Sequence, residues 1–64
     1  MRASVGDRIV IRGHHAGEPD RDGEVLEVGD QGIAPFLVRW EESGHESWLF
    51  PGPDATVQHF EHTR

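Results

Sequence analysis

Apolar and polar residues alternate along much of this 64-residue chain with a period of two residues. The alternation is clearest over residues 7–12, where Ile9 and Ile11 share one face and Arg8 and Val10 share the other. A period of two is typical of β-strands, because successive side chains point to opposite faces of a sheet. We therefore predict a first strand over residues 7–12.

Four further segments carry a strand signal, and turns rich in glycine or proline separate them. The predicted strands cover residues 23–29, 36–40, 46–50 and 55–60. In the first of these, Val25 and Val28 do not share a face, so we expect a bulge or a strong bend there. Residues 51–54 contain two prolines, which cannot donate to a ladder and therefore end the fourth strand. A tight turn, such as one turn of 3₁₀ helix, should follow.

The predicted elements describe a small all-β protein. Five short strands, a long first loop and a break before the last strand are typical of a five-stranded SH3-like barrel. An open sheet of four strands is the main alternative. The length allows one domain, residues 1–64, with a frayed tail at about 60–64. The long polar loop over residues 14–22 is a candidate recognition loop, because such loops often carry function.

The predicted hairpin of the third and fourth strands holds both tryptophans, and its register decides which aromatic side chains are buried. A two-residue turn at Ser43 and Gly44 pairs Val38 with Leu49 and leaves Trp48 outside. A three-residue loop pairs Val38 with Trp48 and buries the aromatic side chains together. We favour the first register, although all of these residues could instead belong to the core. It exposes an apolar patch, whose candidate partner-binding residues are Leu37, Arg39, His45, Trp48 and Phe50.

The composition limits the possible classes of function. The net charge is −6, and twelve carboxylates oppose six arginines, so we do not expect nucleic-acid binding. The absence of cysteine excludes thiolate sites and disulfides, which fits a reducing compartment. The chain has neither the apolar core of a signal peptide near its start nor a run long enough to span a membrane. We therefore expect a cytoplasmic protein without membrane contact.

Histidine is the main candidate metal ligand, and it occurs at His14, His15, His45, His59 and His62. Adjacent histidines on an extended chain point in opposite directions, and no two of the five lie four residues apart. We therefore predict no metal site and no cofactor. His45 and Ser47 share a face, but no nucleophile elbow or oxyanion loop accompanies them. The protein is therefore not expected to be an enzyme.

Short motifs spread over nearly the whole chain are Val5-Gly-Asp7, Gly17-Glu-Pro-Asp20, Gly23-Glu-Val25, Val38-Arg-Trp40, Gly44-His-Glu46 and Phe50-Pro-Gly-Pro-Asp-Ala55. Together they resemble a bacterial, mostly actinobacterial, group known as domain-of-unknown-function family 1918. The resemblance runs from about Val5 to Val57, and its specific part is the last two motifs. It implies an SH3-like barrel and brings no activity with it.

These observations indicate a small non-catalytic protein-interaction module of otherwise unknown function. Its surface would combine the region of Trp48 and Phe50 with the loop over residues 14–22. A metal- or pH-responsive domain built on the histidines and a nucleic-acid-binding small barrel are the alternatives. The sequence leaves the partner, the physiological role and the oligomeric state open.

Overall fold

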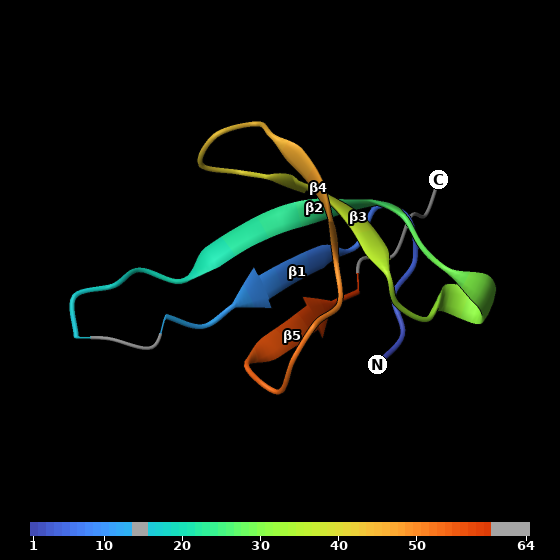
Figure 1. Ribbon diagram of the computed structural model, residues 1–64, viewed down its shortest axis with the longest axis horizontal. Helices are drawn as coiled ribbons and strands as arrows, with labels where there is room; N and C mark the ends of the chain where they lie inside the picture. Colours follow the sequence, from blue (N-terminus) through green and yellow to red (C-terminus); the bar gives the residue numbers. More distant parts are fainter. Residues whose placement is uncertain (14–15, 60–64) are drawn as a thin grey trace.

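A computed structural model describes residues 1–13 and 16–59 of the chain, which form one antiparallel sheet (Figure 1). The elements are β1 (Arg8–Ile11), β2 (Arg21–Glu27), the 3₁₀ turn η1 (Asp30–Gly32), β3 (Phe36–Trp40), β4 (Glu46–Leu49) and β5 (Ala55–Gln58). The strand order across the sheet is β4-β3-β2-β1-β5. The predicted all-β fold of five strands is confirmed in place of the four-stranded alternative. The more specific SH3-like label stays a prediction.

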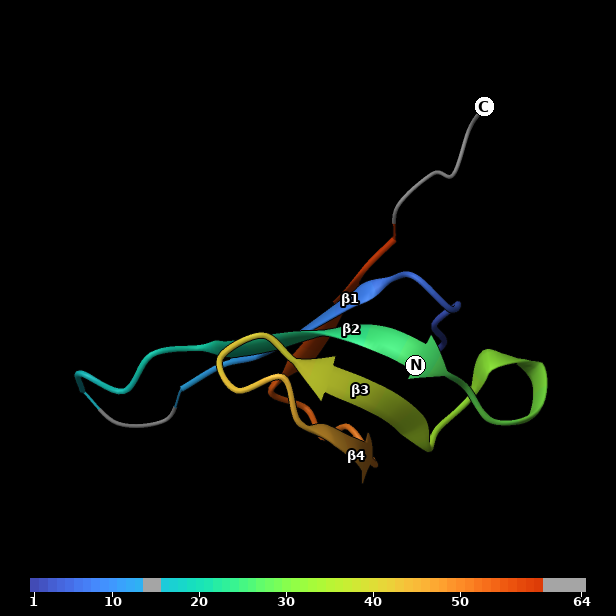
Figure 2. The same cartoon turned by 90° about the horizontal axis from the view of Figure 1, so that it is seen from above.

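The two strands that follow one another at the end of the chain, β4 and β5, lie at opposite edges of the sheet. β5 pairs with β1, where Ile9 lies opposite Val57. Residues 50–54 connect the two edges (Figure 1). Seen from above, β3 and β4 lie on one side of β1 and β2, because the sheet is bent (Figure 2). The bend turns the inner faces of the strands toward one another and allows a single small sheet to enclose a core.

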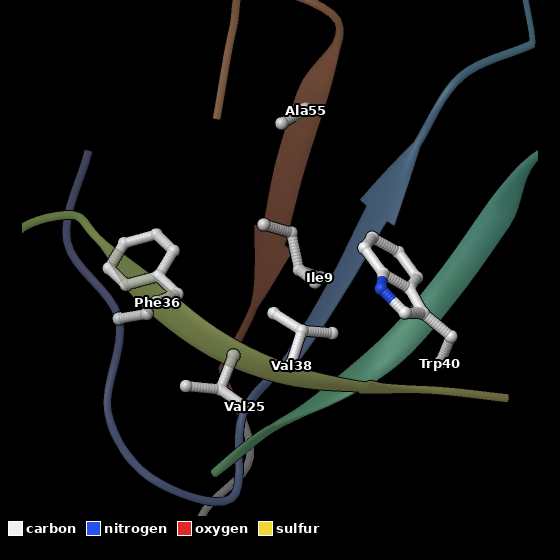
Figure 3. Packing of buried hydrophobic residues seen from close by; sticks show 7 residues of the cluster. Ile9, Val25, Phe36, Val38, Trp40 and Ala55 are labelled. Carbon is white, nitrogen blue, oxygen red and sulfur yellow. The ribbon is translucent and has the colours of Figure 1, made fainter. Parts of the chain in front are cut away.

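The core consists of side chains from the inner faces of the strands and one residue from the N-terminal segment (Figure 3). Its buried members are Ala3, Ile9, Val25, Phe36, Val38, Trp40 and Ala55. Val25 of β2 lies directly opposite Val38 of β3, so two β-branched side chains pack side by side. Trp40 lies opposite Gly23, whose missing side chain lets Cγ1 of Val38 and the Arg39 carbonyl oxygen approach the backbone of β2 closely.

The bulge predicted in the second strand is present. Val25 lies opposite Val38, whereas Glu27, two residues later, lies opposite Leu37, only one residue away on β3. The extra residue on β2 reverses the alternation of side chains after the bulge. Val28 therefore packs against the same core as Val25, although the two do not share a parity in the sequence.

The register of the β3–β4 hairpin differs from the one predicted. Val38 pairs with Ser47 and not with Leu49. The loop comprises residues 41–44, and it is closed by a hydrogen bond that the Trp40 N–H donates to the His45 carbonyl at 2.8 Å. The predicted two-residue turn is therefore wrong, although Gly44 adopts the expected positive φ of 75°.

The observed register has a physical reason on the inner face. Pairing Val38 with Ser47 places the Ser47 hydroxyl where the indole Nε1 of Trp40 donates to it at 2.9 Å. A buried indole N–H needs such a partner. The difference from the predicted register is two residues, from Leu49 to Ser47, and an even shift leaves every side chain on its predicted face. The prediction that Trp48 lies outside is therefore confirmed.

The strand boundaries also differ from the prediction: β1, β2 and β4 were predicted over residues 7–12, 23–29 and 46–50. The tight turn predicted before β5 is present, because the Ala55 N–H donates to the Gly52 carbonyl at 3.1 Å, but the 3₁₀ turn lies elsewhere, at Asp30–Gly32. The last strand ends at Gln58 and not at residue 60. The predicted frayed tail, residues 60–64, lies outside the described residues.

Candidate interaction surface on the β3–β4 hairpin

An apolar surface covers the outer side of the hairpin near the end of β4. Leu37 of β3 lies directly opposite Trp48 of β4, and Phe50 follows that strand. Trp48 is 56% exposed and Phe50 is 75% exposed. We call Leu37, Arg39, Trp48 and Phe50 the hairpin patch.

The exposure of Trp48 follows from the side-chain alternation of β4. Ser47 and Leu49 take the inner positions, and of the four residues in the strand only Leu49 is partly buried. β4 is an edge strand, so it has a neighbour on one side only. The largest side chain of the strand therefore lies outside the core, where it contributes little to stability.

Arg39 of the hairpin patch is held between two carboxylates. Its Nη1 lies 3.8 Å from Oε1 of Glu24, and its Nε lies 3.8 Å from Oε2 of Glu46. All three side chains are about half exposed, so each pair contributes at most about 1 kcal/mol. The positive charge of Arg39 is thus compensated locally, and it does not make the patch basic.

A similar arrangement surrounds Arg8 in the centre of the same outer face. Its guanidinium binds the Asp22 carboxylate and lies 3.4 Å from Oε1 of Glu41. The hydrogen bond to Asp22 raises the pKa of Arg8 further above its ordinary high value. Arg8 therefore stays charged and paired with acidic neighbours.

The tip of the hairpin is acidic. Residues 41–50 contain three glutamates and neither lysine nor arginine. Glu42 binds Nε of Arg21 at 3.2 Å, and Glu41 lies near Arg8. The hairpin patch thus borders a surface with more negative than positive charge.

The inner side of the hairpin holds an open cleft of about 570 Å³. The residues that line it are Arg21, Trp40, Ser43, His45, Glu46, Ser47 and Leu49. Arg21 covers Trp40, with its Cζ 4.4 Å from the centroid of the ring, which is a favourable cation–π distance. His45 belongs to this cleft, because it lies opposite Trp40. The structure therefore separates His45 from the other four candidate residues, which lie on or next to the outer face.

The predicted recognition loop also lies away from the hairpin patch. The loop joins β1 to β2 at the end of the sheet where Ile11 pairs with Arg21. Trp48 lies at the other end, because it pairs with Leu37, and Leu37 pairs with Glu27 at the end of β2. At about 3.3 Å per residue, the length of β2 separates the two ends by roughly 20 Å. The loop and the patch therefore do not form one continuous surface.

A buried carboxylate that the sequence did not single out lies in the turn that precedes β1. Asp7 is 2% exposed, and its Oδ2 accepts the N–H of Ser4 at 2.9 Å. The same oxygen lies 2.6 Å from Nδ1 of His59. His59, expected near a frayed end, therefore connects the end of β5 to the N-terminal turn. An aspartate after Val-Gly is a local sign of a side chain that caps a turn, but no local sign points to His59.

The histidines do not gather at one place in the described chain. His45 lies at the hairpin cleft, and His59 contacts Asp7. Among the described residues, no three metal-ligating side chains form a group that could hold an ion. His14, His15 and His62 lie outside those residues. Within the same residues, no helix has the length and apolar character needed to cross a membrane.

A protein-family model described as "Domain of unknown function (DUF1918)" matches residues 1–57 of the chain. The chain belongs to this family. The family predicted from the sequence motifs is therefore confirmed, and it leaves the function unknown.

Individual relatives of this DUF1918 protein come from mycobacteria. The chain is 45% identical over 58 residues to the uncharacterized protein Rv0569 of Mycobacterium tuberculosis, a match that covers 89% of this chain and 66% of that protein. It is 41% identical over 58 residues to the uncharacterized protein Mb2324 of Mycobacterium bovis, covering 89% of this chain and 72% of the relative. The chain thus spans about two thirds of the length of these relatives. No solved structure matches it.

Proposed function

We propose that this DUF1918 protein is a non-catalytic, cytoplasmic interaction module that binds another protein through the hairpin patch and needs no cofactor. The observation that carries the proposal is the exposure of Trp48 and Phe50 at the end of one short strand. A small domain has few large side chains with which to fill a core. Aromatic residues left outside are those that contribute most at protein interfaces.

The surroundings of the patch support a protein partner over a nucleic acid. Arg39 is paired with Glu24 and Glu46, and the net charge of the chain is −6. A phosphate backbone would meet repulsion here. A protein surface can cover aromatic side chains and adapt its polar rim to the carboxylates.

The experiment compares three immobilised forms of the protein in a lysate of the native host. They are the wild type, the double variant Trp48→Ala with Phe50→Ser, and the control Val5→Ser. Val5 is 59% exposed and lies in the N-terminal turn outside the hairpin, so its removal changes exposed apolar area elsewhere. Circular dichroism and thermal melting establish that all three forms are folded.

A protein that binds through the hairpin patch is retained by the wild type and by Val5→Ser and is lost from the double variant. We expect the purified partner to bind the double variant at least about tenfold more weakly, because buried aromatic residues dominate interface energies. If every protein retained by the wild type is retained equally by the double variant, the patch is not a binding surface and the proposal is wrong.

A further inference from the structure

We propose that the partner of the hairpin patch is an extended, basic segment of another protein, which adds to the outer edge of β4 as a further strand. This inference rests on the proposed function and specifies how the surface is used. Three observations carry it: the open edge of β4, the alternation of its side chains, and the charge of the hairpin.

Within the described residues, 1–13 and 16–59, β4 pairs with one strand, β3. The Trp40 N–H donates to the His45 carbonyl, so His45 faces β3 with its backbone groups. In an antiparallel pair, residues that exchange hydrogen bonds alternate with residues whose N–H and C=O groups point away. The backbone groups of Glu46 and Trp48 therefore point to the outer edge, where they are placed to pair with an additional strand.

β4 is short and carries Glu46, but it lacks the proline, lysine and bulge by which many natural edges prevent pairing. Its pairing with β3 is regular from Phe36 opposite Leu49 to Arg39 opposite Glu46. The opposite edge strand, β5, differs, because its exposed residues are Thr56 and Gln58 and it carries no aromatic side chain. Of the two edge strands, β4 is therefore the one that combines open backbone groups with a large exposed apolar side chain.

Side chains of an added strand would meet two different surfaces. Residues opposite Trp48 and Glu46 would lie on the outer face, beside the exposed indole and a carboxylate. Residues opposite Ser47 and Leu49 would lie above the inner cleft of about 570 Å³. Alternating basic and aliphatic residues fit these two surfaces, since a guanidinium can contact both a carboxylate and an indole.

Charge selects a basic segment over a second copy of the same chain. Residues 41–50 carry three glutamates and neither lysine nor arginine, and each copy has a net charge of −6. Two copies paired through β4 would bring two acidic hairpins together, which costs free energy at low ionic strength. A basic strand experiences attraction at the same place.

The test uses a synthetic peptide of eight residues in which arginine and valine alternate, with both ends blocked. Its binding to the wild-type protein is followed by NMR, as shifts of backbone amides and as the rate of amide hydrogen exchange. Three matched peptides serve as controls. One has N-methyl groups on alternate backbone nitrogens of the hydrogen-bonding edge, one has them on the opposite edge, and one replaces each arginine by glutamate.

We expect the arginine peptide to slow hydrogen exchange at the amides of Glu46 and Trp48 and to shift both β4 and the inner cleft. Methylation of the hydrogen-bonding edge should weaken binding by about tenfold or more, because it removes strand hydrogen bonds and adds steric clash. Methylation of the opposite edge should have little effect. Glu46→Gln should weaken binding and reduce its salt dependence, and the glutamate peptide should not bind.

Three results would overturn the proposal: no binding of the arginine peptide, equal binding of all methylated forms, or protection confined to amides outside β4. Concentration-dependent dimerisation of the free protein with protection of Trp48 would assign the edge to a second copy and would also overturn it. Loss of a native partner from the Trp48→Ala, Phe50→Ser variant, combined with any of these results, would leave the proposed function standing and refute strand addition alone.

Discussion

His59 places its Nδ1 2.6 Å from Oδ2 of Asp7, although the two residues are 52 positions apart in the chain. The contact joins the end of β5 to the turn that precedes β1. Asp7 is buried and also accepts the N–H of Ser4, whereas the His59 side chain is 64% exposed. Loss of the buried Asp7 carboxylate should therefore lower the free energy of unfolding more than loss of the exposed His59 ring.

Replacement of Asp7 by Asn should lower the free energy of unfolding by about 1–3 kcal/mol, because a buried acceptor of hydrogen bonds is altered and a new donor is buried. His59→Ala should cost less, about 1 kcal/mol or below, since solvent can replace an exposed partner. Urea denaturation of both variants measures the difference. Equal losses for the two variants would contradict the assignment of Asp7 as the structural member of the pair.

Removal of the aromatic side chains at the hairpin patch should hardly change stability. Trp48→Ala is expected to change the free energy of unfolding by less than about 0.5 kcal/mol, as is usual for exposed positions. Phe36→Ala, which empties a fully buried position, should cost about 3–5 kcal/mol and can unfold so small a domain. Thermal melting of the two variants tests this contrast. A large loss for Trp48→Ala would mean that the indole belongs to the core.

The two tryptophans should report different environments in fluorescence. Trp40 is 6% exposed and donates to Ser47, whereas Trp48 is 56% exposed. In Trp48→Phe, the remaining emission should be protected from acrylamide and should lie at shorter wavelength. In Trp40→Phe, the remaining emission should be quenched readily. Similar quenching in the two variants would show that the faces of β4 are assigned wrongly.

Gly23→Ala should destabilise the sheet strongly. A Cβ at this buried position would lie 2.6 Å from the backbone oxygen of Arg39 and 2.6 Å from Cγ1 of Val38. Such overpacking costs about 1–3 kcal/mol, because backbone atoms must move. Gly44→Ala provides a control with open space around its Cβ but a φ of 75°, where the strain amounts to about 1–2 kcal/mol. If urea denaturation shows that Gly23→Ala is as stable as the wild type, the close packing of β2 on β3 is contradicted.

Much of this fold could be predicted because strand signals are local. The alternation around Ile9 predicted a strand, and the odd spacing between Val25 and Val28 predicted a bulge. The structure contains both. The hairpin faces were also predicted correctly, because parity survives an even shift. The pairing itself was not predicted, since it depends on the bond between Trp40 and Ser47, a contact across the sheet.

The candidate site was predictable only in part for the same reason. Trp48 and Leu37 share a face by alternation alone, so the sequence indicates their neighbourhood. His45 alternates in phase with Ser47 and Leu49, so the sequence pattern already places it on the inner face and not with the outer patch to which it was assigned. The contact between Asp7 and His59 joins distant segments, and no periodic pattern contains that information.

The pairing of β1 with β5 has a consequence for how the protein is made. Arg8 near the start of the sheet lies opposite Gln58, and Ile9 lies opposite Val57. During translation, the first strand leaves the ribosome long before its partner, so the side of the core formed by Ile9 remains uncovered until residue 58 has emerged. Sheets with such distant pairings fold late and slowly. The last side of the core can therefore form only after β5 is available to pair with β1.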